Sequence, residues 1–139
     1  LVADGDSIGD QLVVQDASTG VEREVSPVLS DFVDAAWTAD GRALIYGWYD
    51  EGRGTRLVRW ERATGRRQDV GVYAGRRLEL FWTLPDEGLL TFDQSGAAIE
   101  RIAAGSATVA RRYALPDEQA ARVLGVSPDG LRATTMAWT

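Results

Sequence analysis

Four residue types are missing from the 139-residue chain: cysteine, histidine, lysine and asparagine. Without cysteine the chain has no disulfide, no thiol nucleophile and no cysteine metal ligand, and its redox compartment stays open. Without histidine it lacks the general base that most serine hydrolases use. All 15 basic residues are therefore arginine, a bias that we attribute to a GC-rich bacterial genome rather than to a binding site.

Long apolar runs and an excess of positive charge are also missing. No stretch approaches the roughly 20 apolar residues of a transmembrane helix, although 45% of the residues are hydrophobic. The formal net charge of −6 disfavours nucleic acid as a partner, because phosphate binding needs a basic surface. We therefore expect a soluble globular module without a membrane span, and the sequence indicates no cofactor.

What the chain does contain is an internal repeat with a period of about 45 residues. Residues 37–41 (WTADG) return as residues 82–86 (WTLPD) and as residues 126–130 (VSPDG). A second landmark shares the period, at residues 16–20 (DASTG), 61–65 (ERATG) and 101–105 (RIAAG). Short apolar runs separated by turn residues at this period are typical of β-propeller blades. The sequence therefore predicts an all-β fold of about three four-stranded antiparallel blades, part of a larger or assembled propeller.

The middle copy predicts strands at 33–39, 43–49, 55–61 and 66–72. Blades pack face to face, so both faces of a middle strand can be apolar. Trp37 and Trp82 share a repeat position, which predicts equivalent buried sites on successive blades, and Trp60 is also expected to pack between blades. Alternation predicts three dry faces: Val33, Ala35 and Trp37; Leu44, Tyr46 and Trp48; and Leu78, Leu80 and Trp82.

The period divides the chain into a partial blade (1–32), two blades (33–77 and 78–121) and a second partial blade (122–139). A closed propeller typically has about four to eight blades. We therefore expect either a piece of a longer polypeptide, which we favour, or a homo-oligomer whose copies close the ring. In both cases an isolated three-blade arc is expected to be poorly soluble, because it leaves two β faces unpaired.

Two parts of the repeat resemble a known family. Residues 127–130 (SPDG), and residues 39–46 (ADGRALIY) in the better-preserved copy, resemble the repeated hairpin of TolB-like propellers, which prolyl-oligopeptidase-type peptidases share. Residues 12–20 (LVVQDASTG) resemble the same group. The resemblance implies a non-catalytic scaffold that binds protein or peptide, in a bacterial periplasmic or extracellular setting. It alternatively implies the gating propeller of a serine peptidase whose catalytic domain lies outside this chain. The Gly-His and Trp-Asp signature of WD-type propellers is absent.

Two patterns imitate catalytic sites without completing them. Ser7 lies in a Gly-x-Ser-x-Gly sequence, but the hydrolases that use this motif need a histidine base, which the chain lacks. Asp50-Glu51 and Asp117-Glu118 pair carboxylates as a glycosidase requires, yet both pairs fall in loops without an apolar pocket. We therefore predict no catalytic residue in this chain.

A third pattern is a candidate metal loop. Asp4, Asp6 and Asp10 alternate with glycine in partial imitation of a calcium-binding loop. Ile8 stands where an oxygen ligand is expected and Gln15 stands where a bidentate glutamate is expected, so a solvated acidic hairpin is the alternative interpretation.

Propellers commonly bind partners through loops on one rim of a rigid scaffold. The longest hairpin insertion, residues 49–54 (YDEGRG), mixes an aromatic ring, two acids and an arginine, which is a mixture favoured at protein contacts. We predict that Tyr49, Asp50, Glu51 and Arg53 bind a protein or peptide, together with Asp93 from the next blade. A mobile solvent loop is the alternative for this hairpin.

Overall fold

The computed structural model describes residues 9–74, 77–93, 98–114 and 121–137. Every regular element in these ranges is a β-strand, which confirms the all-β prediction. Within the same ranges, no helix is long and apolar enough to cross a membrane.

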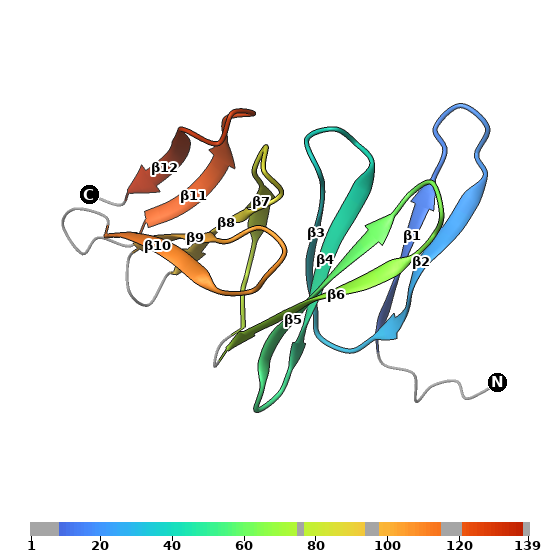
Figure 1. The fold of residues 1–139 in the computed structure, drawn as a ribbon, viewed down its shortest axis with the longest axis horizontal. Helices are drawn as coiled ribbons and strands as arrows, with labels where there is room; N and C mark the ends of the chain where they lie inside the picture. Colours follow the sequence, from blue (N-terminus) through green and yellow to red (C-terminus); the bar gives the residue numbers. More distant parts are fainter. Residues whose placement is uncertain (1–8, 75–76, 94–97, 115–120, 138–139) are drawn as a thin grey trace.

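The strands form four antiparallel sheets that follow one another along the chain (Figure 1). In each sheet, strands that are consecutive in sequence are hydrogen-bonded neighbours, as in propeller blades. The first sheet contains β1 (Asp10–Gln15) and β2 (Glu22–Leu29); the second contains β3 (Phe32–Trp37), β4 (Ala43–Asp50), β5 (Gly54–Glu61) and β6 (Arg67–Ala74); the third contains β7 (Phe81–Thr83), β8 (Leu89–Asp93), β9 (Ala98–Ile102) and β10 (Val109–Ala114); and the fourth contains β11 (Ala121–Val126) and β12 (Ala133–Ala137).

The second sheet is buried on both faces because it lies between two others. Its face toward the first sheet packs Leu44, Tyr46, Val58 and Trp60 against Val25 and Leu29 of β2. Its opposite face packs Ile45, Leu57 and Tyr73 against Leu78, Phe81, Leu89 and Ile102. The continuous apolar run that opens β4 follows from this arrangement, since each of its two faces meets a different neighbouring sheet.

The turn between the first two strands of a blade recurs three times, with an aspartate at its centre. Asp40, Asp86 and Asp129 each accept a hydrogen bond from the backbone N–H two residues later, at 3.0, 2.8 and 3.0 Å respectively. These bonds to the carboxylate lower the pKa of Asp40 and Asp86, and a bond from the Ser127 hydroxyl does so for Asp129 ahead of the backbone bond. The turn geometry therefore gives a structural alignment of the repeats.

In the third sheet, this structural alignment differs by one residue from the alignment of the repeats by sequence. The structural counterpart of Asp40 is Asp86, whereas the sequence alignment had matched Asp40 with Pro85. The reason is a shorter turn: Leu84 N–H bonds to the carbonyl of Gly88, whereas Thr38 N–H bonds to that of Ala43. The shared Trp-Thr pair had therefore set the wrong register.

The prediction that Trp37 and Trp82 are equivalent buried residues is consequently wrong. Trp37 is 41% exposed, and Trp82 is half-buried. Trp37 is the last residue of β3, the strand that begins the second sheet. The first sheet, which lies opposite β3, contains only two described strands. Trp60 behaves as predicted: it is 1% exposed, and Trp37 meets it edge to face with ring centroids 6.4 Å apart.

One of the predicted buried faces is wrong because β3 contains a bulge. The register between β3 and β4 shifts between Phe32 and Asp34, so that simple alternation fails there. Val33 therefore packs toward the third sheet and Ala35 toward the first, although the sequence predicted a common face. The predicted face of Leu78, Leu80 and Trp82 also fails, since Leu78 is buried and Leu80 is 41% exposed. The face of Leu44, Tyr46 and Trp48 is confirmed.

Candidate binding rim

The β4–β5 hairpin, which carries the predicted binding residues, forms a defined turn at one end of the second sheet (Figure 1). Asp50 pairs with Gly54 across the hairpin, and Arg53 N–H donates to the carbonyl of Asp50 at 2.9 Å. The Arg53 and Asp50 side chains approach to 3.9 Å. Glu51 and Arg53 are exposed at the tip, whereas Tyr49 is half-buried at the base.

Two connections between sheets support the base of this hairpin. Tyr49 N–H donates to the carbonyl of Asp31, in the β2–β3 connection, at 2.9 Å. Arg77, in the β6–β7 connection, pairs with the Asp31 carboxylate at 3.0 Å and donates to the carbonyl of Phe32 at 3.2 Å. Asp31 has a φ of 57°, a left-handed backbone that an aspartate tolerates better than most residues. Three segments distant in sequence therefore meet at one rim, which we call the hairpin rim.

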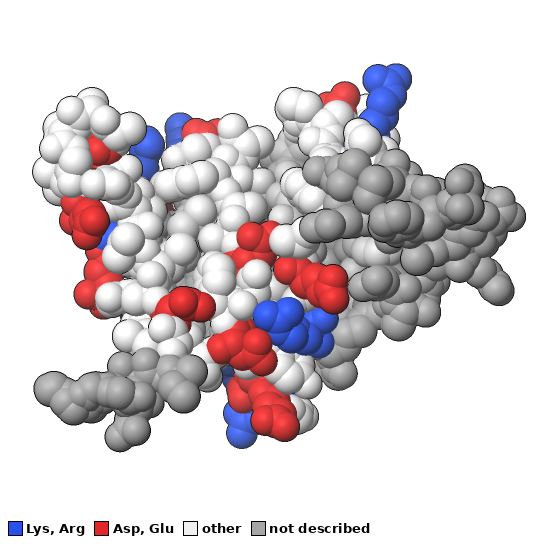
Figure 2. All heavy atoms as spheres, turned by 180° about the vertical axis from the view of Figure 1, so that it is seen from behind, with Lys and Arg blue, Asp and Glu red and all other residues white. Residues whose placement is uncertain are grey.

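The hairpin rim is rich in charge. Figure 2, seen from behind, shows acidic side chains gathered with basic ones along the lower edge of the molecule, where Figure 1 places the β4–β5 hairpin. Glu51 is exposed and, among the described residues, has no basic group within ion-pair distance. The rim thus offers both a free carboxylate and arginines that are already paired.

Asp31 and Arg77, which organise the hairpin rim, were not among the sequence-based candidates. The Ser30-Asp31 pair between two apolar runs indicates a turn, but nothing in the sequence links it to an arginine 46 positions away. Asp93 ends β8 and begins the corresponding hairpin of the third sheet, whose residues 94–97 lie outside the described ranges.

The candidate metal and catalytic residues are mostly outside the described part of the chain. This applies to Asp4, Asp6, Ser7 and the Asp117-Glu118 pair. Asp10 opens β1, where it pairs with Leu29. In the described ranges, no group of three or more acidic residues is arranged to hold a metal ion. The calcium-loop hypothesis therefore stays a prediction.

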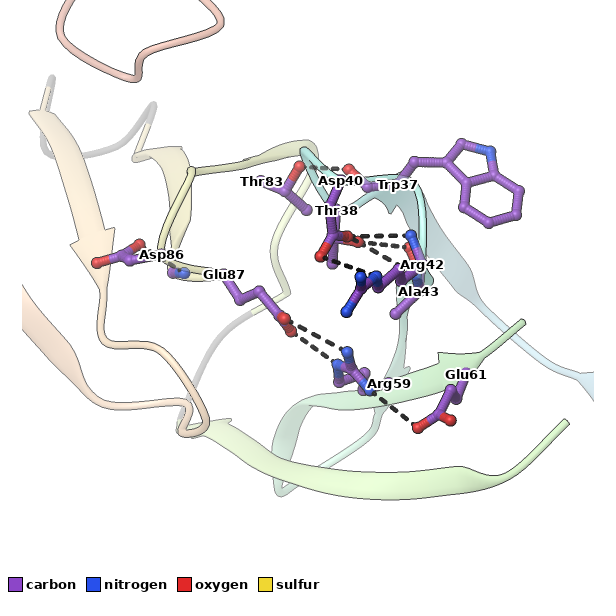
Figure 3. A network of polar contacts seen from close by, with 11 residues as sticks. Trp37, Thr38, Asp40, Arg42, Ala43, Arg59, Glu61, Thr83, Asp86 and Glu87 are labelled. Atoms are coloured by element: carbon purple, nitrogen blue, oxygen red, sulfur yellow. Dashed lines mark hydrogen bonds and ion pairs between the residues drawn. The ribbon is translucent and has the colours of Figure 1, made fainter. Parts of the chain in front are cut away.

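The opposite ends of the strands carry a second ionic cluster, which joins the second and third sheets (Figure 3). Arg59 of β5 holds Glu87 through two bonds, Nε to Oε1 at 2.7 Å and Nη2 to Oε2 at 3.3 Å. It also lies 3.7 Å from Glu61. The hydrogen bond with Glu87 raises the pKa of Arg59 above its ordinary value, although burial acts in the opposite direction.

Glu87 makes this bond from a strained backbone. Its φ is 67°, and the equivalent turn positions in the second and fourth sheets are Gly41 and Gly130. Glycine adopts this conformation without a steric penalty, whereas other residues pay about 1–2 kcal/mol. The ion pair between the two sheets is therefore formed by a residue whose backbone conformation in the turn is strained.

We expect Glu87→Ala to lower the free energy of unfolding by about 1–2 kcal/mol, because it removes the bidentate pair and keeps the strain. Glu87→Gly should lower it by about 1 kcal/mol less, since glycine relieves the strained φ. Urea denaturation of both variants measures the difference, and a double-mutant cycle with Arg59→Ala isolates the pair. A glycine variant that is less stable than the alanine variant would contradict the strain argument.

A third contact between these sheets involves a half-buried carboxylate. Asp34 of β3 accepts the Phe81 N–H at 3.1 Å through Oδ2 and the Ala35 N–H at 2.8 Å through Oδ1. Burial raises the pKa of Asp34 above its ordinary value, and the two backbone bonds oppose that shift only in part. At neutral pH the ionised Asp34 side chain therefore lowers the stability of the folded protein.

The raised pKa gives a testable pH dependence. The folded protein binds a proton at Asp34 more readily than the unfolded chain, so the stability contribution of this group rises as pH falls through the folded-state pKa. We expect Asp34→Asn, which keeps one acceptor for Phe81, to match or exceed the parent protein by up to about 1 kcal/mol at neutral pH. This difference should shrink as denaturation is repeated toward about pH 4. A variant that is less stable at every pH would show that the lost acceptor outweighs the buried charge.

Comparison with solved structures identifies proteins with a similar architecture. No protein-family model and no curated protein matches the sequence. TolB from Acinetobacter baumannii superposes with a TM-score of 0.63 and 17% identity, over 88% of this chain and 31% of TolB. A Bacteroides fragilis protein provisionally assigned as a 6-phosphogluconolactonase gives a TM-score of 0.48 and 19% identity, over 68% of this chain and 29% of that protein; this similarity is too weak to add to the argument. The chain thus spans less than a third of the length of TolB, and it folds as blades of a TolB-like β-propeller.

Proposed function

We propose that this chain is a non-catalytic propeller scaffold that binds a protein or peptide at the hairpin rim. The observation that carries the proposal is the convergence of the β4–β5 hairpin with the Asp31 and Arg77 connections. Tyr49 N–H and Arg77 both bond to Asp31, so the base of the hairpin is held while Glu51 and Arg53 stay exposed. A rigid base reduces the conformational entropy that binding would otherwise cost.

The kind of partner follows from the chemistry of the rim. Exposed charged side chains next to a half-buried tyrosine suit a polar peptide or protein surface. Tyrosine and arginine are also enriched among the residues that dominate binding energy. No observation on the described residues favours the gating propeller of a peptidase, and that alternative is not proposed.

Peptides selected from a random display library against the purified chain test this proposal without knowledge of the natural partner. The double variant Glu51→Arg/Arg53→Glu alters the rim and keeps the net charge, and Glu22→Arg/Arg111→Glu exchanges exposed charges elsewhere as a matched control. We expect most selected peptides to lose at least about tenfold in affinity with the rim variant and to be unaffected by the control. Mass spectrometry should recover the peptides uncleaved.

Two outcomes would contradict the proposal. Peptides that bind the rim variant as tightly as the parent chain would place the binding surface elsewhere. Cleaved peptides would contradict the absence of catalysis, provided that every independent preparation of the purified chain shows the same cleavage.

A further inference from the structure

The turns at the other end of the second sheet border two adjoining open hollows of about 460 and 290 Å³. Arg42, Arg59 and Arg62 line the larger hollow, and Arg59, Arg66 and Arg67 line the smaller. Glu61 borders both. We call this surface the arginine hollow. It lies at the opposite end of β4 and β5 from the hairpin rim.

Three of these arginines are available to a ligand. Arg62, Arg66 and Arg67 are exposed, and among the described residues no carboxylate lies within ion-pair distance of them. Arg59 differs, because Glu87 and Glu61 hold its guanidinium in place (Figure 3). Arg42 is only loosely paired, at 4.0 Å from Asp40. The arginine hollow therefore combines one fixed guanidinium with several free ones.

The repeat supplies an internal control for the role of these side chains. The turn before the last strand of the blade contains a glycine at positive φ in each of the first three sheets, Gly20, Gly65 and Gly105, with φ of 75°, 72° and 69°. Counted from this glycine, residues 61–67 (ERATGRR) contain three arginines and residues 16–22 (DASTGVE) contain none. Residues 101–107 (RIAAGSA) contain one, Arg101, which pairs with Asp86 at 2.9 Å. The turn geometry therefore does not require arginine, although the chain as a whole carries a net charge of −6.

We propose that the arginine hollow binds an extended acidic segment of a protein partner. Guanidinium groups recognise carboxylates through paired hydrogen bonds, and arginine is favoured over other residues for that geometry. The arginines are spread over two adjoining hollows, which suits successive carboxylates along a chain better than a single small anion. This surface is distinct from the hairpin rim, so the inference goes beyond the proposed function.

Fluorescence anisotropy with labelled octaglutamate, at about 20 mM salt to limit screening, tests the proposal on the whole chain. We expect octaglutamate to bind despite the negative charge of the protein, and Arg62→Glu/Arg66→Glu to weaken binding by at least about tenfold. Arg111→Glu/Arg132→Glu changes the net charge equally at exposed positions outside both surfaces. This control should weaken binding by less than about threefold. Should the charge-reversed variant fail to fold, Arg62→Gln/Arg66→Gln replaces it, with about a fivefold loss expected.

Three results would overturn the proposal. Octaglutamate that does not bind the parent chain would exclude the acidic segment as a ligand. Equal losses in the hollow variant and in the control would reduce the effect to net charge. Inorganic phosphate that displaces octaglutamate at equal concentration would identify a small-anion site instead. Each of these results leaves the peptide test at the hairpin rim unaffected, because that test does not involve Arg62 or Arg66.

Discussion

Trp60→Ala is expected to lower the free energy of unfolding by about 3–5 kcal/mol. The Trp60 side chain is 1% exposed and belongs to the core between the first and second sheets. Truncation to alanine removes the largest side chain of that core and leaves a cavity that two packed sheets cannot collapse into. The Arg23 guanidinium, 5.0 Å from the Trp60 ring centroid, loses its cation–π partner as well.

Trp37→Ala is the matched control for this prediction. Trp37 contacts Trp60 edge to face but is 41% exposed. Its removal should lower the free energy of unfolding by only about 1–2 kcal/mol. Guanidinium denaturation of the two variants, followed by circular dichroism, gives both values. Equal losses would mean that the first sheet does not cover Trp60 in solution as it does in the structure.

The strand pattern of the second sheet could be read from its sequence because the residues that form it act locally. Apolar runs bounded by Asp40-Gly41 and Thr64-Gly65 give the correct order of strands, and β4 and β5 begin and end within one residue of the predicted bounds. Glycine at positive φ marks the same turn position in several sheets. These signals depend only on neighbours in the chain, so sequence alone carries them.

The register of the repeats failed where two local signals disagreed. The Trp-Thr pair of residues 82–83 resembles residues 37–38, yet the aspartate that organises the turn comes one residue later in the third sheet. A side chain that accepts a backbone N–H fixes the turn more strongly than a matching aromatic residue. Alignment on Asp40, Asp86 and Asp129 would have given the correct register.

The ion pairs between the sheets could not be predicted from the sequence. The Arg59–Glu87 and Arg77–Asp31 pairs join residues 28 and 46 positions apart. Both acids sit at positive φ, and periodicity gives no information about such strained positions. The candidate hairpin was found from its composition, and the connections at residues 26–34 and 74–77 were expected at the same rim, but the contacts of Asp31 with Tyr49 and Arg77 become visible only when the sheets are stacked.

Glu100 should be the most sensitive polar residue of the described chain. Glu100 lies in β9 and is only 4% exposed. Its carboxylate accepts a hydrogen bond from the Tyr73 hydroxyl at 2.6 Å, across the interface between the second and third sheets. Arg112 of the adjacent strand approaches the other carboxylate oxygen to 3.8 Å. This contact joins the two sheets where little water reaches it.

We expect Glu100→Ala to lower the free energy of unfolding by about 2–4 kcal/mol, because the buried Tyr73 hydroxyl loses this acceptor and Arg112 loses a countercharge. Tyr73→Phe, which removes only the hydroxyl, should lower it by about 1 kcal/mol. The exposed Glu79→Ala in the β6–β7 connection is the control and should change it by no more than about 0.5 kcal/mol.

The double variant Tyr73→Phe/Glu100→Leu separates hydrogen bonding from packing. It replaces both polar partners with apolar groups, so no buried donor is left without its acceptor at this contact. Its loss of stability should therefore be smaller than the sum of the losses of Tyr73→Phe and Glu100→Leu measured singly, and urea denaturation of the three variants gives the coupling free energy. Additive losses would show that the Tyr73–Glu100 bond contributes nothing to the association of the two sheets. The stability of their interface would then come from the apolar contacts around Leu57, Phe81 and Ile102 and from the other polar contacts between the sheets, such as Arg59–Glu87.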